Sequence, residues 1–441
     1  MNALFHLRTF AFLLSLLAAL ATTRADIQVL VSVKFIHNND GPNTRPAVNI
    51  GTAAGFGQEV NYGNTVLDAT TRGYSIAVVE YLDITPPAPA GAPANVTGNT
   101  TAAGPTVMCN NTAGLQNFMR VTGAGIPVNT VILSITTNSG FTMSNNATAN
   151  ANSVAIAASF PPDHWYNLPA RDTRQYIETT ALASQAVWRW NPGAINIYVN
   201  NSSSGQCSFV GTGGSISLGN VGTGTVLHEI GHIVNLQHTH ALDYTTNTNP
   251  PTEVPPRAFA LSDLADGDAL TVTLSDNLAG GDGLSETVND NPNITNHDQL
   301  SQALFGHPYD PPPSPPNAPF ATPAERAIVD SAFQNVMSYH NEAVFLPVQM
   351  DIWTQNANGA RIGFCTGRTW FIANGGNNSS SGLTAALPLA TIVSGFTHVS
   401  TSTPNDVVLL RAGSYAAPTG GVLSTPSTLR ATRGEATVHF P

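Results

Sequence analysis

The sequence predicts an α+β fold: a twisted, mixed sheet with one central helix, a small all-β insert and a β-rich C-terminal segment. Runs rich in Val and Ile, typical of strands, alternate with stretches of helical period, in the order 27–35, 57–68, 75–82, 172–188 and 194–199. A Gly/Ser-rich loop over 203–224 then leads into a strongly apolar helical segment. At 441 residues, the chain is long enough for two or three domains with cores of their own.

Residues 1–25 have the pattern of a secretory signal. Arg8 precedes an apolar run over 10–21, and the small residues around Arg24 suit cleavage before Asp26. The apolar run is too short to span a bilayer, and no later stretch is longer. We therefore expect a secreted, extracellular protein without membrane insertion.

The charge of the chain excludes two classes of partner. The net charge is −11, and loss of Arg8 and Arg24 with the signal, which holds no acidic residue, changes it to −13. An acidic surface argues against nucleic acid and against anionic membranes as partners. Charged residues make up only 10% of the chain, and Lys34 is its only lysine.

The three cysteines lie far apart, at Cys109, Cys207 and Cys365. An odd number at such spacing indicates neither a disulfide framework nor a cysteine-based zinc site. At most one bridge can form, and the pairing we expect is Cys207 with Cys365.

The chain opens with a β–α–β pattern and then changes character. In the helix expected at 57–68, Val60 and Leu67 lie two turns apart on one face. A proline-rich stretch at 86–89 ends this pattern, and residues 85–160 read as an inserted β module. Its short β runs are expected at 118–121, 131–136 and 154–160.

The insert, through the stretches 111–115, 121–127 and 141–144, resembles the small β modules of bacterial surface and phage-tail proteins. Two interpretations stay open for it. It is either a solvated spacer or a surface that holds the protein near its substrate.

The main domain resumes after residue 160. The helix expected at 172–188 places Ile177, Ala181, Ser184 and Trp188 on one face, where Ser184 is the only polar member and is small enough to pack. A strand follows at 194–199. The next helix is expected to bury its apolar positions against the sheet, namely Val226, Leu227, Ile230, Ile233 and Val234.

That helix carries the residues with recognisable chemistry. His228 and His232 stand four residues apart, so a helix projects both from one face, where they can share a metal ion. Glu229 between them can polarise a water on that metal. His-Glu-x-x-His on a helix is the signature of zinc hydrolases.

A third metal ligand is expected at His238, six residues after the second histidine. Asn235 can end the helix because asparagine tolerates the left-handed conformation, and such an end turns the chain back towards the metal. His240 is the alternative third ligand. Three imidazoles and one water form the ligand set of a catalytic zinc site rather than a structural one.

The segment 241–335 is acidic and rich in loops. Within it, residues 280–287 gather carboxylate, hydroxyl and carbonyl oxygens around tight turns, which suits Ca²⁺. A solvated turn is the alternative. Eight prolines over 307–323 predict an extended surface loop, after which a helix at 323–332 leads to the segment 334–340.

The C-terminal segment forms a further module. Its β-rich stretches at 388–392, 406–415 and 428–432 resemble the opening coils of right-handed parallel β-helix proteins. One or two coils are too few to bury a core of their own. The module must therefore pack on the main domain, associate with another chain, or be a truncated remnant.

Residues 228–238 resemble the long zinc-binding motif of the metzincin metalloproteases, and Val336-Met337-Ser338-Tyr339 resembles their Met-turn. Within that group the likeness is greatest to the pappalysin (cytophagalysin) type, through residues 204–209, 236–239, 281–287 and 346–350. It covers 26–84 loosely and 163–355 more firmly. Two of its departures are Asn235 in place of the usual glycine and Glu286 where the group tends to have aspartate. The paired cysteines expected near the calcium segment are also missing.

The resemblance implies a metzincin-type zinc endopeptidase that hydrolyses protein or peptide substrates. By this resemblance, Zn²⁺ is bound by His228, His232 and His238, and Glu229 is the general base. Met337 forms the apolar floor beneath the metal, and Tyr339 contacts the metal or the tetrahedral intermediate. The resemblance also implies that Ca²⁺ is bound by Asp282, Glu286 and Thr287. The domains are then a signal at 1–25, a catalytic domain in two parts at 26–84 and 161–360, the insert at 85–160 and the C-terminal module at 361–441.

Two other functions stay open. The first is a non-catalytic surface or adhesion protein, in which the β modules carry the function and the metzincin core is relict. The insert and the C-terminal module together make up about a third of the chain, which favours this alternative. The second is a zinc hydrolase that acts on a bond other than a peptide bond.

Overall fold

The structure is a computed structural model. It describes residues 27–39, 44–169, 173–203, 205–207, 214–236, 238–239, 257–260, 271–274, 296–311, 319–338, 344–358, 365–384, 387–399, 406–418, 427–431 and 436–439. The predicted signal at 1–25 lies outside these residues. None of the helices in the described ranges combines the length and the apolar character that crossing a bilayer requires.

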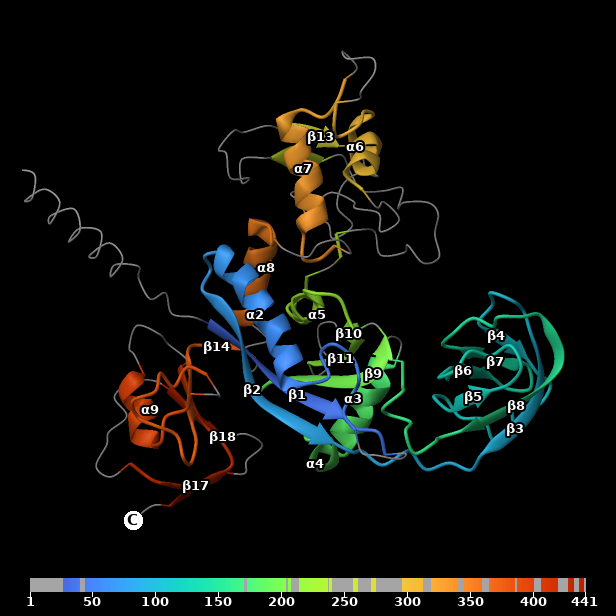
Figure 1. The fold of residues 1–441 in the computed structure, drawn as a ribbon, viewed down its shortest axis with the longest axis horizontal. Coiled ribbons are helices and arrows are strands. Elements are labelled where there is room, and N and C mark those ends of the chain that lie inside the picture. The colour runs from blue at the N-terminus through green and yellow to red at the C-terminus, as the bar shows by residue number, and fades with distance from the viewer. Residues whose placement is uncertain are drawn as a thin grey trace, which may run out of the picture.

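A six-stranded mixed sheet forms the centre of the molecule (Figure 1). Its strands are β1 (Ile27–Ile36), β2 (Tyr74–Ile84), β9 (Ile195–Ser203), β10 (Gly205–Cys207), β11 (Ser215–Asn220) and β14 (Cys365–Thr366). β1 pairs in parallel with β2 along one edge and with β9 along the other, and β9 pairs in parallel with β11. β10 and β14 add antiparallel pairs, so the predicted mixed sheet is present.

The first two strands flank helix α2 (Ala53–Ala69), as the β–α–β pattern predicts. The helix begins four residues earlier than predicted, because the hydroxyl of Thr52 caps it by accepting a hydrogen bond from the N–H of Gly55 at 3.1 Å. Phe56, Val60 and Leu67 are buried on its inner face.

The two faces of the sheet bury different partners, because successive side chains of a strand point to opposite sides. On one face, alternate residues of β1 from Val29 to Phe35 pack with α2, with α5 (Thr225–Ile233) and with α8 (Pro347–Asn358). All five apolar positions predicted for α5 and the residue after it are buried in this core. The candidate site therefore stands on the face that holds the larger core.

The opposite face packs against α3 (Arg174–Ala183) and α4 (Gln185–Trp188). The prediction of one helix over 172–188 with Ser184 on its packed face is wrong. Ser184 leaves helical geometry (φ −138°, ψ 54°) and is exposed. This break turns Trp188 into an aromatic cluster, where its ring meets Trp165 and Tyr198 edge to face.

The insert is a separate lobe with its own antiparallel six-stranded sheet (Figure 1). Its strands are β3 (Ala94–Thr100), β4 (Thr106–Met108), β5 (Arg120–Thr122), β6 (Ile132–Thr136), β7 (Gly140–Met143) and β8 (Ala151–Ser159). The short runs predicted from sequence correspond to β5, β6 and β8. The other three strands were not predicted, since Asn, Thr and Gly dominate them or their flanks and give a weak β signal.

The C-terminal module packs on the main domain, which is the first of the three alternatives that the sequence left open. Its elements are β15 (Thr369–Ile372), α9 (Ile392–His398), β16 (Asp406–Leu410), β17 (Gly413–Ala416), β18 (Ser427–Ala431) and β19 (Ala436–His439). The strands pair in parallel, in the orders β15-β16-β18 and β17-β19. Phe371, Val407 and Leu409 bury against Leu30 and Val79 on the sheet face opposite α5.

The remaining elements lie between α5 and α8 in the chain. They are the antiparallel pair β12 (Arg257–Ala260) and β13 (Thr271–Leu274), followed by α6 (His297–Phe305) and α7 (Pro323–Gln334). α7 begins with a reciprocal capping box between Thr322 and Glu325. It occupies the predicted position and delivers the chain to the segment around Met337.

The expected bridge between Cys207 and Cys365 is wrong, because Cys365 is a free, buried thiol. Cys365 pairs with Val29 of β1, whereas Cys207 pairs with Ile216, which the strand registers place level with Val33. Four residues along a strand are about 13 Å, and a disulfide needs Cα atoms within about 7 Å. Burial raises the pKa of Cys365 to about 12.

Candidate metal centre

The start of α5 is fixed by a carboxylate from another helix. Gly224, the N-cap residue, has a left-handed backbone (φ 93°) and no side chain with which to cap the helix. Glu59 of α2 supplies the missing acceptor, because its Oε2 accepts a hydrogen bond from the N–H of Gly224 at 2.9 Å. Burial raises the pKa of Glu59, and hydrogen bonds from the N–H groups of Gly224 and Val226 oppose that shift.

The end of α5 turns the chain as the sequence predicts. Asn235 has a φ of 74°, in the left-handed region. The N–H of Leu236 donates to the carbonyl of Gly231 at 3.0 Å, and the N–H of Asn235 donates to that of His232 at 2.9 Å. These two bonds form a Schellman motif, which satisfies the last carbonyls of the helix and sends the chain back across its end.

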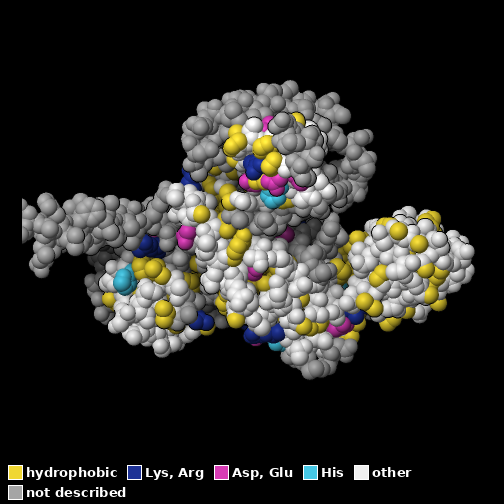
Figure 2. All heavy atoms as spheres, turned by 45° about the horizontal axis from the view of Figure 1, so that its top comes forward, with side chains coloured by type: hydrophobic (Ala, Val, Ile, Leu, Met, Phe, Trp, Pro, Cys, Tyr) yellow, Lys and Arg dark blue, Asp and Glu magenta, His cyan; other side chains and the backbone are white. Residues whose placement is uncertain are grey.

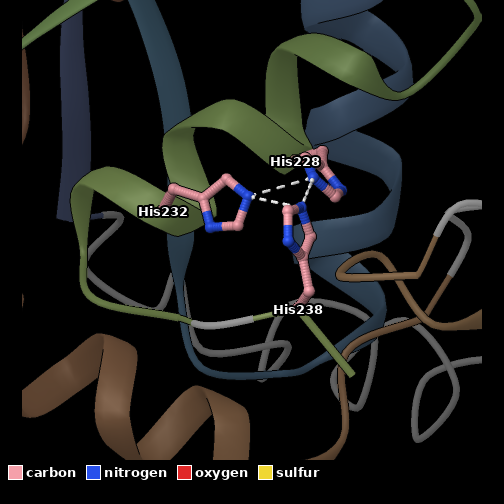
Figure 3. Close-up of side chains that lie close together, drawn as sticks. All are labelled: His228, His232 and His238. Carbon is pink, nitrogen blue, oxygen red and sulfur yellow. Dashed lines mark hydrogen bonds between the residues drawn. The ribbon is translucent and has the colours of Figure 1, made fainter. Parts of the chain in front are cut away.

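This turn brings three imidazoles together (Figure 3). The Nε2 atom of His228 lies 3.1 Å from that of His232 and 3.2 Å from that of His238. The Nε2 atoms of His232 and His238 are 3.0 Å apart. His228 and His232 are buried and His238 is half-buried, so the three nitrogens share a largely dehydrated position.

The spacing of these nitrogens fits a metal ion. A tetrahedral ion with metal–nitrogen bonds of about 2.05 Å separates its nitrogen ligands by about 3.3 Å. The three observed separations, 3.0–3.2 Å, are close to that value. A neutral imidazole has one N–H group. In His228 and His232 that group is at Nδ1 and points to a backbone carbonyl, away from the shared position. The three histidines can therefore hold a metal ion with their Nε2 lone pairs.

Backbone carbonyls orient the first two rings. The Nδ1 atom of His228 lies 2.6 Å from the carbonyl oxygen of Val336, and that of His232 lies 2.7 Å from the carbonyl oxygen of Leu236. Each Nδ1–H donates to its carbonyl, which leaves the Nε2 lone pair directed at the shared position. Burial also lowers the pKa of His228 to about 4, with the Val336 hydrogen bond opposing. The ring is therefore neutral near pH 7, as a metal ligand must be.

Met337 forms an apolar floor beneath α5. Its side chain is fully buried, and Gly231 is the residue of the helix that lies over it. A Cβ atom at position 231 would lie only 2.6 Å from the Sδ atom of Met337. The carbonyl oxygen of Met337 also accepts a hydrogen bond from the N–H of Thr239 at 3.2 Å, which fixes the residue after the third histidine.

The turn that holds Met337 is itself fixed by two buried amides that the sequence did not reveal. The Asn335 side chain donates to Oε1 of Gln349 at 3.0 Å and accepts from its Nε2 at 3.1 Å. Asn335 also accepts from the N–H of Met337, and Gln349 from that of Leu346. Both amides are therefore satisfied, and they join the turn to α8. For Gln349, the only indication in the sequence is the resemblance of residues 346–350 to the pappalysin type.

The other predicted site residues divide into two groups. Glu229 lies on α5 between the two histidines, and the residue is 7% exposed. The remaining predicted or alternative residues lie outside the described ranges, and these are His240, Asp282, Glu286, Thr287 and Tyr339. Within the described part of the chain, the cluster of His228, His232 and His238 is the one group of His, Cys, Asp or Glu residues with metal-binding geometry.

Searches of protein-family models, of curated proteins and of solved structures found no match to this chain.

Proposed function

We propose that this protein is a secreted zinc endopeptidase of the metzincin type. The observation that carries the proposal is the convergence of three Nε2 atoms at 3.0–3.2 Å on a helix that also bears Glu229. A structural metal site would fill its fourth position with another protein ligand, usually a cysteine. The three histidines match the ligand set of catalytic zinc sites, in which water takes the fourth position.

Zinc is the metal that the ligand set favours. Imidazole binds Zn²⁺, Cu²⁺, Fe²⁺ and Ni²⁺, whereas Ca²⁺ and Mg²⁺ prefer oxygen ligands. Three histidines around a near-tetrahedral position are the ligand set of many catalytic zinc sites. When bound, zinc supplies Lewis-acid chemistry, which activates a water and polarises the scissile carbonyl.

The residues of the chain have separate roles in the proposed reaction. Glu229 takes a proton from the attacking water and passes it to the leaving amine of the substrate. Tyr339 stabilises the negative charge that develops on the carbonyl oxygen as the carbon becomes tetrahedral. Met337 forms the apolar floor beneath α5, where its buried side chain packs against Gly231. No acyl-enzyme forms, because water attacks the carbonyl directly.

The proposal includes Ca²⁺ as a second cation, at Asp282, Glu286 and Thr287. Its support is the oxygen-rich sequence of that segment and the resemblance to pappalysins. Export to the extracellular space rests on the signal-like residues 1–25.

The experiment compares hydrolysis of a denatured protein by the wild type and by Glu229→Gln, each loaded with zinc. Asp351→Asn on α8 is the matched control, since it also removes one negative charge, from a side chain that is 63% exposed. We expect Glu229→Gln to bind zinc and to lose at least about 100-fold in rate, the usual contribution of a general base. Asp351→Asn should keep full activity, and chelation should abolish it. Equal rates for the wild type and Glu229→Gln would reject the proposal.

A second candidate is a surface or adhesion protein with an inactive metzincin core. The observation that favours it is the folding of the insert as a lobe with a sheet and a core of its own. The same experiment separates the two functions. One zinc ion per chain without hydrolysis by the wild type would favour adhesion.

A further inference from the structure

The lobe formed by the insert is almost free of charge. Residues 94–160 contain eleven asparagines and one charged residue, Arg120. That guanidinium is engaged at the junction with the main domain, where its Nη1 lies 3.0 Å from a carboxylate oxygen of Asp163. Figure 2 shows the visible face of this lobe, at the right, in the colours of uncharged and apolar side chains. Whatever the lobe binds, it cannot recognise that partner by charge.

An open trough of about 920 Å³ runs over the outer face of this lobe. Its floor is the central strand pair β3 and β8, whose outward side chains alternate with core residues. Those outward residues are short, such as Thr97, Ala155 and Ala157, so the floor is low. The loops after β4 and between β6 and β7 form a rim with Asn110 and Asn138.

The lining of the trough consists mainly of side chains that can form hydrogen bonds. Its asparagines and hydroxyl residues include Asn95, Asn110, Asn138 and Thr97, and none of the described residues that line it has a charged or aromatic side chain. Each asparagine amide carries two donors and one acceptor, and Asn, Ser and Thr adapt readily to a polar ligand. Among the described lining residues, Met108 is the one large apolar side chain that is exposed, at 54%.

We propose that this trough binds a neutral polysaccharide chain. Vicinal hydroxyls of an uncharged sugar present paired donors and acceptors that match side-chain amides, and the volume lies within the range of about 300–1,000 Å³ typical of ligand sites. A protein partner would need the apolar, aromatic-rich centre of a protein interface, which this lining lacks. Uronate or sulfate sugars, like nucleic acid, would meet no cationic side chain among the described residues of the lining.

The proposal goes beyond the proposed function, because it assigns the lobe a ligand and leaves the metal site untouched. Where both hold, the lobe keeps the protease on a glycan-rich surface. Binding and hydrolysis are separate measurements, so that failure of one proposal is distinguishable from failure of the other. Affinity for a single chain is expected to be weak, since each hydrogen bond to the sugar replaces one to water.

The experiment uses the full chain in native affinity gels that contain dextran, mannan, laminarin or galactomannan, with alginate as the charged comparator. A printed panel of neutral oligosaccharides extends the search to other linkages and to N-acetylated sugars. Two trough variants are tested, Asn95→Ala/Asn110→Ala and Thr97→Arg, the second of which fills the floor. The control is Asn117→Ala/Asn146→Ala, at exposed asparagines of the same lobe that do not line the trough. Thermal unfolding checks that all variants fold.

We expect at least one neutral probe to bind the wild type and the control equally. Both trough variants should bind it at least about tenfold more weakly, because they remove or block several hydrogen bonds. Hydrolysis of a soluble denatured protein should be the same in all four proteins. Absence of binding to every neutral probe would overturn the proposal, as would binding that survives Thr97→Arg or a preference for alginate.

Discussion

The carboxylate of Glu59 accepts a hydrogen bond from the N–H of Gly224 at 2.9 Å and thereby joins α2 to the first turn of α5. The residue that caps the helix of the histidine cluster is thus 165 positions away in sequence. A buried carboxylate at this end also interacts favourably with the helix dipole. The position of His228 and His232 therefore depends on a helix that contributes no ligand.

Removal of this cap is expected to destabilise the protein. Glu59→Ala leaves buried N–H groups without an acceptor and should lower the free energy of unfolding by about 1–3 kcal/mol. Glu59→Gln keeps an acceptor and should cost less. Urea unfolding of the metal-free proteins measures both, with the exposed neighbour Gln58→Ala as the control. If Glu59→Ala were no less stable than Gln58→Ala, the cap would have no role.

Gly231 is expected to be required by the bulk of Met337. In Gly231→Ala the new methyl group would meet the Sδ atom, so we expect a loss of about 1–3 kcal/mol in stability and weaker zinc binding. The double variant Gly231→Ala/Met337→Ala supplies the missing space. Its loss should be smaller than the sum of the two single losses, as determined by urea unfolding and zinc titration. Additive losses would show that the two side chains do not compete for one position.

The amide pair of Asn335 and Gln349 is expected to hold the turn beneath the site. Each single alanine variant leaves the NH2 group of the other buried amide without its acceptor and should cost about 1–3 kcal/mol, whereas the double variant should cost less than the sum of the two single losses. Asp351→Ala, at an exposed position of the same helix, is the control. A coupling energy of zero between Asn335 and Gln349 in this cycle would contradict the assignment.

His164 is expected to make the protein sensitive to acid. Its ring is buried, neither ring nitrogen has a hydrogen-bond partner among the described residues, and burial lowers its pKa to about 3. In the unfolded chain a histidine has a pKa near 6.5, so between about pH 3 and 6.5 the unfolded state binds more protons than the folded state. The free energy of unfolding is therefore unaffected by His164 above about pH 6.5 and falls as the pH decreases below it.

His164→Phe removes this proton linkage and keeps an aromatic ring beside Trp165. Between pH 6.5 and 4.5, the wild type should lose about 2 kcal/mol more than the variant, at about 1.4 kcal/mol per pH unit. Urea unfolding at both pH values measures the difference. The exposed His439→Phe is the control and should behave as the wild type does. The same pH dependence in His164→Phe would assign the acid sensitivity to other groups.

The sequence predicted the parts of the site that are local in the chain. The spacing of His228 and His232 on a helix, and the left-handed end at Asn235, follow from helix geometry and backbone sterics alone. The β–α–β opening and the buried face of α5 also follow from periodicity. Each of these features depends on residues only a few positions apart.

The parts that could not be predicted depend on distant residues. Glu59 reads as an ordinary helical glutamate until α2 is placed beside α5, and Gln349 reads as a surface amide until the turn at Asn335 faces it. The break at Ser184 is likewise decided by the aromatic partners of Trp188 rather than by helix period. Tertiary contacts determine these features, and the local sequence either gives no indication of them or favours a different structure.

We infer that His228, His232 and His238 together bind one zinc ion, and the most direct test of this inference is the zinc content after dialysis. The metal per chain is measured by mass spectrometry for the wild type, His238→Ala and His240→Ala. We predict one zinc ion in the wild type and in His240→Ala and much less than one in His238→Ala, because the three Nε2 atoms already lie within 3.0–3.2 Å of one another. One zinc ion per chain in His238→Ala, or no zinc in the wild type, would contradict this inference.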